Sequence, residues 1–334
     1  MPELPRVALI VTGGTIDSVG VDRLDLAWYI EAAKRLPEGE LLDSLPELSR
    51  VAQVAEVPFR RIPSQAITFQ DWIDLVHRIH ETFSADEADG IVITHGTNTL
   101  EETAYFLHLT LKTDRPVVIV GSMRPSSGLS ADGYLNVLNA VRVAADPQSR
   151  GMGVLVVLND TIHSARDVTK TATYRLEAFQ GRDLGPLGYS DADGRVLYYH
   201  RPVRPHTTAT DFDVDELGAD IPRVDLVVSY VGADGSAIDA AVAAGARGIV
   251  SAGTGAGRPT PGEDEALARA RAQGVVICQG TRVGSGRTVQ SPKARERGDI
   301  GADNLVPWKA RILLTLGLAK TSDPQELQRL FDKY

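Results

Sequence analysis

The stretch IVITHGTNTLEET, residues 91–103, decides the fold class. A run of apolar, mostly β-branched residues ends at a His-Gly pair, and a helical pattern begins soon after it. Such a run is typical of a buried strand in a parallel sheet. Because open α/β sheets bind ligands at the carboxyl ends of their strands, we expect Thr97, Asn98 and Thr99 to lie at a ligand site.

Two other stretches have the same form. Residues 7–16, VALIVTGGTI, predict a strand followed by a Gly-Gly turn, and residues 154–170 predict a strand with Lys170 beyond its end. A glycine pair lets the backbone approach a ligand closely, so Thr15 is placed where its hydroxyl could attack. A phosphate-binding turn ranks lower, because neither GxGxxG nor GxxxxGK[ST] is present.

Lys170 has two interpretations. Taken alone, a lysine in a loop is a solvated surface charge. A lysine that is held beside hydroxyl groups, with its ammonium desolvated, could instead have a lowered pKa and act as a base.

The three stretches together, residues 7–16, 91–103 and 154–170, suggest one composite site, because each strand end carries hydroxyl, amide or amine groups.

The segments between these strands predict ordinary elements. Apolar spacing indicates helices over 21–50 and 69–83, and residues 51–57 indicate a strand. Ser64, in the polar loop between them, is an ordinary loop hydroxyl if taken alone. Thr99 and Glu102 form a capping-box pattern at the start of a helix over 100–111. Neither Glu102 nor its neighbour Glu101 therefore needs a catalytic role.

The alternation of strands and helices predicts an α/β protein with two domains. Residues 1–200 form a larger, doubly wound domain with a mostly parallel sheet. Residues 201–222, rich in glycine, proline and aspartate, form a linker, and residues 223–334 form a smaller α/β domain.

Composition excludes several classes of function. The net charge of -9 disfavours nucleic acid and anionic membrane surfaces as partners. No apolar stretch is long enough to cross a bilayer. The seven histidines lack metal-ligand spacing, so no metal site is expected. The single cysteine, Cys278, excludes an internal disulfide and fits a reducing, cytoplasmic location. A small molecule, or another copy of the chain, is the expected partner.

Three motifs carry a resemblance to a known family. They are TGGTI (12–16), HGTNTLEETAYFL (95–107) and VLVVLNDTIHSARDVTKTATYRLEAF (154–179). In this order, with the later GTGAG and SPKAR segments, they resemble the bacterial-type L-asparaginases. The resemblance implies hydrolysis of a side-chain amide without a cofactor. It also implies homodimers or homotetramers whose active sites are completed by a neighbouring subunit.

The resemblance assigns roles to individual residues. Thr15 resembles the family's nucleophile, and Thr97 and Lys170 match the threonine and lysine of its activating pair. Ser64 matches the serine that holds the substrate's α-carboxylate. Further substrate contacts are expected from the side chains and backbone of Gln65, Asn98, Gly14, Gly96, Tyr29 as the lid tyrosine, Arg258 and Lys293.

Three of these positions depart from the family pattern. Asn98 replaces the aspartate that pairs with the substrate's α-ammonium, and Arg258 and Lys293 stand near the positions of an asparagine and a glutamate. Asp17 is the acid nearest to Thr15 in sequence, although a turn role explains it equally well. An amide that lacks a free α-amine is therefore an alternative substrate. A non-catalytic protein that binds small anions and a tRNA-amidotransferase remain the other hypotheses.

Overall fold

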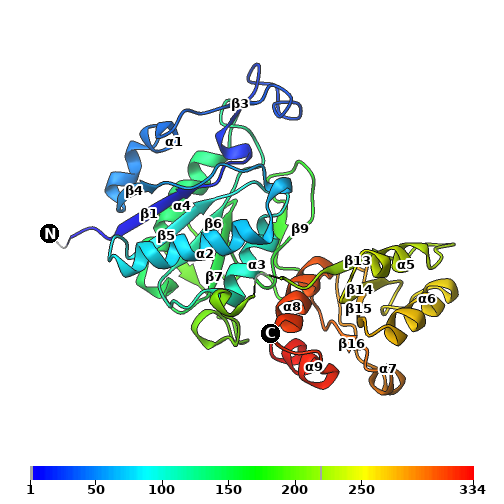
Figure 1. Cartoon of the computed structure of the whole chain (residues 1–334). Helices are drawn as coiled ribbons and strands as arrows, with labels where there is room; N and C mark the ends of the chain where they lie inside the picture. Colours follow the sequence, from blue (N-terminus) through cyan, green and yellow to red (C-terminus); the bar gives the residue numbers. More distant parts are fainter. Residues whose placement is uncertain (1–2, 219) are drawn as a thin grey trace. The chain divides into compact units, whose positions relative to one another are not determined.

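The computed structural model describes residues 3–218 and 220–334 (Figure 1). Residues 1, 2 and 219, which the predicted first domain and linker include, lie outside the described residues. The chain divides into two compact units, Met1–Asp211 and Phe212–Tyr334, and each is described by itself.

The first unit is built on an eight-stranded sheet with the order β12-β11-β8-β7-β6-β5-β1-β4. The strands from β4 to β7 in this order are parallel, and β8, β11 and β12 are antiparallel. The predicted mostly parallel sheet is therefore confirmed. The strands are β1 (Arg6–Val11), β4 (Gln53–Val57), β5 (Gly90–Thr94), β6 (Val117–Val120), β7 (Val154–Leu158), β8 (Thr161–Ser164), β11 (Gly188–Ser190) and β12 (Val196–Tyr198).

Helices lie on both faces of this sheet. The helices α2 (Phe69–Ser84) and α3 (Leu100–Thr110) lie in front of it in Figure 1, and α4 (Gly133–Ala145) lies behind it. Alternate strand residues such as Leu9 and Val92 pack with α4 in one buried cluster, because successive side chains of a strand point to opposite faces. The unit is therefore doubly wound, as predicted.

The order of the strands indicates where on the sheet a ligand would bind. The chain passes from β1 to β4 on one side, and β5 then lies on the other side of β1. Where the strand order reverses in this way, the carboxyl ends of the neighbouring strands leave a crevice in which open α/β proteins bind ligands. The segments that follow β1 and β5 are therefore the first place to look for a site.

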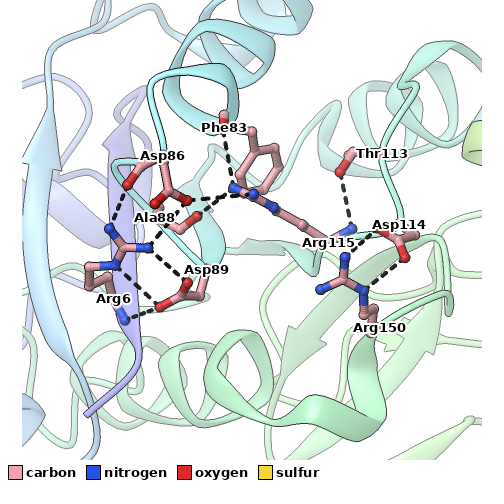
Figure 2. Close-up of polar contacts among 9 residues, drawn as sticks. All are labelled: Arg6, Phe83, Asp86, Ala88, Asp89, Thr113, Asp114, Arg115 and Arg150. Carbon is pink, nitrogen blue, oxygen red and sulfur yellow. Dashed lines mark hydrogen bonds and ion pairs between the residues drawn. The ribbon is translucent and has the colours of Figure 1, made fainter. Parts of the chain in front are cut away.

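The amino ends of the same strands carry a network of exposed charges (Figure 2). Arg6, at the start of β1, donates to the carboxylate of Asp89 through its backbone N–H at 2.8 Å and its guanidinium at 3.0 Å. Arg150 forms two hydrogen bonds to Asp114, at 2.8 and 2.9 Å. This network lies at the edge of the sheet opposite to the carboxyl ends of the parallel strands, where open α/β proteins bind ligands.

The helix predicted over 21–50 is wrong. Only α1 (Glu40–Asp43) is α-helical there, and a two-stranded sheet, β2 (Ser18–Val19) with β3 (Lys34–Arg35), precedes it. The carboxylates of Asp22 and Asp25 accept hydrogen bonds from nearby backbone N–H groups. Such local bonds compete with the helical hydrogen-bond pattern, so the segment forms turns.

The second unit is a smaller α/β domain. Its four strands are parallel, with β14 and β15 in the centre. Two helices end the chain, as predicted from residue 307 onwards. The strands are β13 (Val224–Val228), β14 (Gly248–Gly253), β15 (Val276–Thr281) and β16 (Ile300–Gly301), and the helices are α5 (Ser236–Ala243), α6 (Pro261–Ala272), α7 (Pro292–Glu296), α8 (Pro307–Lys320) and α9 (Pro324–Lys333).

The described residues contain neither a membrane-spanning helix nor a cluster of metal ligands. None of the helices in residues 3–218 and 220–334 is both long and apolar enough to span a bilayer. Within the same ranges, no group of three or more His, Cys, Asp or Glu side chains could hold a metal ion. Cys278 is buried in β15, and burial raises the pKa of its thiol.

Candidate active site

The turn after β1 carries Thr15 at the carboxyl edge of the sheet. Gly13 and Gly14 have φ values of 100° and 116°, which glycine adopts far more readily than other residues. A Cβ atom on Gly14 would lie 2.5 Å from the Cα atom of Gly96. The turn therefore packs backbone against backbone on the segment after β5, and Thr15 and Thr97 directly follow the two glycines that meet there.

Tyr29 contacts Thr15 directly. Their hydroxyl oxygens lie 2.8 Å apart, and the tyrosine is 8% exposed. Burial raises the pKa of Tyr29, while the hydrogen bond with Thr15 opposes this shift. The phenol therefore stays protonated at neutral pH. Tyr29 lies in the irregular segment after β2, and its hydroxyl faces the proposed nucleophile instead of only filling the core.

Thr97 and Lys170 form the second pair of the site. The Nζ atom of Lys170 donates a hydrogen bond to Oγ1 of Thr97 at 2.8 Å. Lys170 lies in the short strand β9 (Thr169–Lys170), which pairs with β10 (Phe179–Gln180). Burial lowers the pKa of its ammonium, and the charge of Glu101 opposes the shift. The surface-charge interpretation of Lys170 is thus wrong, since the side chain is partly buried and hydrogen-bonded to a buried threonine.

The predicted capping box at the start of α3 is not formed. The hydroxyl of Thr99 donates instead to the backbone carbonyl of Ser64, at 2.7 Å, and makes no cap hydrogen bond. The prediction is wrong because a partner 35 residues away takes this hydroxyl. The bond ties the loop of Ser64 to the start of α3.

Glu101, which the sequence interpretation named as needing no catalytic role, contacts the backbone of Lys170. It is 5% exposed, and its Oε1 atom accepts a hydrogen bond from the backbone N–H of Lys170 at 2.9 Å. A carboxylate is seldom buried without a partner. Its place next to apolar residues in LEETAYFL was the available signal.

Ser64 and Gln65 lie beside the segment after β5. Ser64 is buried, and a Cβ atom on Gly96 would lie 2.5 Å from its Oγ atom. The serine hydroxyl therefore packs against Gly96, next to Thr97. Gln65 is exposed, and its Oε1 atom accepts a long, 3.5 Å hydrogen bond from the side-chain amide of Asn98. Two neutral amides thus face each other at this rim of the site.

His95 is a residue that the sequence interpretation did not single out. Its Nδ1 atom lies 2.8 Å from the carbonyl oxygen of Gly96, which can only accept, so Nδ1 carries the proton. Its Nε2 atom, 2.9 Å from the hydroxyl of Thr103, is then the acceptor. Burial lowers the pKa of His95 to about 4. This neutral ring fixes the peptide group that joins Gly96 to Thr97. The signal in the sequence was the position of His95, directly before Gly96 and the proposed catalytic Thr97.

The remaining predicted residues lie elsewhere. Asp17 is buried, with its carboxylate 3.9 Å from a guanidinium nitrogen of Arg61. This contact favours a structural role in the turn. Arg258, in the turn after β14, and Lys293, in α7, belong to the second unit, so their contacts with substrate stay predictions.

Comparisons with known proteins identify the family of the chain. Residues 6–204 match the family model described as Asparaginase, N-terminal, and residues 223–331 match the Glutaminase/Asparaginase C-terminal domain. L-asparaginase 2 of Bacillus subtilis is 41% identical over 99% of this chain and 87% of that protein. The glutaminase-asparaginase of Pseudomonas fluorescens is also 41% identical, over 99% of this chain and 91% of that protein.

A solved structure is similar along its whole length. The crystal structure of a probable cytoplasmic L-asparaginase from Campylobacter jejuni matches with a TM-score of 0.92 and 38% identity, covering 99% of this chain and 100% of that one. Sequence relatives, both family models and the fold lead to one conclusion. The chain belongs to the asparaginase family and is an asparaginase-like amidohydrolase.

Proposed function

We propose that the protein hydrolyses the side-chain amide of L-asparagine, or of a related acid monoamide, through an acyl-enzyme on Thr15. The observation that carries this proposal is the 2.8 Å contact of Lys170 Nζ with Thr97 Oγ1. This pair lies beside the turn that carries Thr15. A hydroxyl is a weak nucleophile at its ordinary pKa and needs a nearby base, and a partly desolvated lysine can supply one.

The reaction takes place in two halves. The hydroxyl of Thr15 attacks the amide carbon, and the free amine of Lys170 accepts the released proton through Thr97. The proton then passes to the departing nitrogen, and ammonia leaves an ester on Thr15. In the second half a water molecule attacks the ester, with the same pair as base, and the acid is released. The N–H of Thr97, in the peptide that His95 fixes, is the proposed donor to the developing oxyanion.

Assays on a panel of amides test which substrate the protein hydrolyses. We expect ammonia release from L-asparagine, and also from succinamate and N-acetyl-L-asparagine, which both lack a free α-amine. Coupled assays give kcat and KM for each compound. Absence of ammonia from every amide, with folded protein, would contradict the amidohydrolase proposal.

The alternative substrate, an amide without an α-amine, is favoured by one observation. Where a carboxylate could pair with the α-ammonium of asparagine, the neutral amide of Asn98 faces that of Gln65. We expect Asn98→Asp to lower the KM for L-asparagine about fivefold, since a partly exposed ion pair is worth about 1 kcal/mol, and to leave the KM for succinamate unchanged. Equal effects on both substrates would remove the support for this alternative.

The proposal extends to partners and location. We propose a homodimer or homotetramer in which a neighbouring subunit completes the site, with Arg258 and Lys293 near the substrate. Sedimentation velocity distinguishes these states from a monomer. We also propose a cytoplasmic location, supported by the single cysteine and by the similarity to the probable cytoplasmic L-asparaginase of Campylobacter jejuni. Cell fractionation tests it.

A further inference from the structure

Glu101 connects the two elements that form the activating pair. It lies in the first turn of α3, four residues after Thr97, and its carboxylate accepts the backbone N–H of Lys170 at 2.9 Å. The side chain of the same lysine donates to Thr97 at 2.8 Å. One lysine is thus held at both ends, by Glu101 at its backbone and by Thr97 at its amine.

Glu101 also acts on the lysine through its charge. It is the acidic group whose field opposes the effect of burial on the Lys170 ammonium. The other charged groups around it come from neighbouring segments: Arg166 and Asp167 lie before β9 and bind each other at 2.9 Å. The charges of Asp183, Glu101, Arg166 and Asp167 all act on Arg182, which follows β10. The carboxylate of Glu101 is therefore close enough for its charge to act on both Lys170 and Arg182.

The residue next to Thr97 makes the carboxylate of Glu101 more important for Lys170. Asn98, directly after Thr97, brings no charge, and its amide bonds to Gln65. We propose that Glu101 is the positioning residue of Lys170: its carboxylate accepts the backbone N–H of Lys170 in β9 and places a negative charge beside the segment that carries the amine. This inference rests on the proposed role of Lys170 as the base.

The variant Glu101→Gln separates the two effects. Glutamine keeps an oxygen that can accept the backbone N–H of Lys170, but it removes the negative charge. Without that charge the ammonium loses its proton at lower pH, so the acid limb of the kcat/KM profile should move about one pH unit towards acid. A weaker base also lowers the plateau severalfold. A merely structural role would lower the rate at every pH and leave the limb in place.

Two matched variants complete the test. Glu102→Gln removes a carboxylate from the same helical turn, and we expect its acid limb to coincide with that of the parent. Glu101→Asp keeps the charge on a shorter side chain, so we expect a lower kcat with the limb within a few tenths of a unit of the parent. If Glu101→Gln folds poorly, Glu101→Asp still tests the proposal. This variant keeps the charge, so an acid limb that moves about one pH unit in it would overturn the proposal.

The outcome for Glu101 is separate from that for the proposed function. A Glu101→Gln limb that coincides with the parent's, in protein with an unchanged melting temperature, would overturn the inference alone. Full activity of Lys170→Met would instead overturn the role of the lysine, and with it the proposed function.

Discussion

Thr15→Ala should lower kcat for ammonia release by about 10⁴-fold or more, because loss of a nucleophile removes nearly all of the chemical acceleration. KM should change little, since Ser64 and the backbone at Gly96 remain. The substitution also removes the hydrogen bond to Tyr29, at a cost of about 1 kcal/mol in the free energy of unfolding. The fold should therefore survive the change.

Thr15→Ser is the matched control for this loss. Serine keeps the attacking hydroxyl and its partner Tyr29, and it lacks only a methyl group. We expect it to retain kcat within about tenfold of the parent, far above the alanine variant. Steady-state ammonia release and thermal unfolding, measured on both variants, separate chemistry from stability. Equal kcat for Thr15→Ala and the parent would contradict the assignment of the nucleophile.

Lys170→Met should lower kcat by about 10²- to 10⁴-fold, the usual contribution of a general base. Methionine fills a similar volume but cannot accept a proton or bond to Thr97. The backbone contact with Glu101 should remain, because it involves only the N–H of residue 170. We therefore expect a folded protein that still binds substrate and reacts slowly.

Lys170→Arg distinguishes a base from a simple positive charge. A guanidinium stays protonated throughout the working pH range, so it supplies charge without basicity. We expect Lys170→Arg to be as slow as Lys170→Met in ammonia-release assays at saturating substrate. Recovery of most of the parent's kcat by arginine would show that the site needs only a cation at this position.

The strands of the site could be predicted because their signals are local. Residues 91–94 and 154–158 are short apolar runs next to turn residues, and both are strands in the structure. Their carboxyl ends meet at one edge because parallel strands share a direction. From this rule the sequence indicated that Thr15, Thr97 and Lys170 would be close. The structure joins Lys170 to Thr97 by a hydrogen bond and packs the Thr15 turn against Gly96.

The contacts that were missed depend on tertiary structure. Residues 21–50 have helix-like apolar spacing, but aspartates at 22 and 25 bind the local backbone and the segment turns. Tyr29 lies in the same turning segment, and its hydroxyl is 2.8 Å from that of Thr15. Glu101 and Lys170 are 69 residues apart, and no spacing rule relates a helix start to a distant two-residue strand. Such pairings follow from packing, which the sequence pattern alone does not specify.

The most direct test of the account is chemical identification of the acyl-enzyme. Enzyme mixed with substrate and quenched in acid within milliseconds can be digested and analysed by mass spectrometry. The account requires an added acyl group on the peptide that contains Thr15, released by the parent within its turnover time and absent from Thr15→Ala. An acyl group on Thr97 or on any other residue, in enzyme that turns over at its full rate, would contradict it.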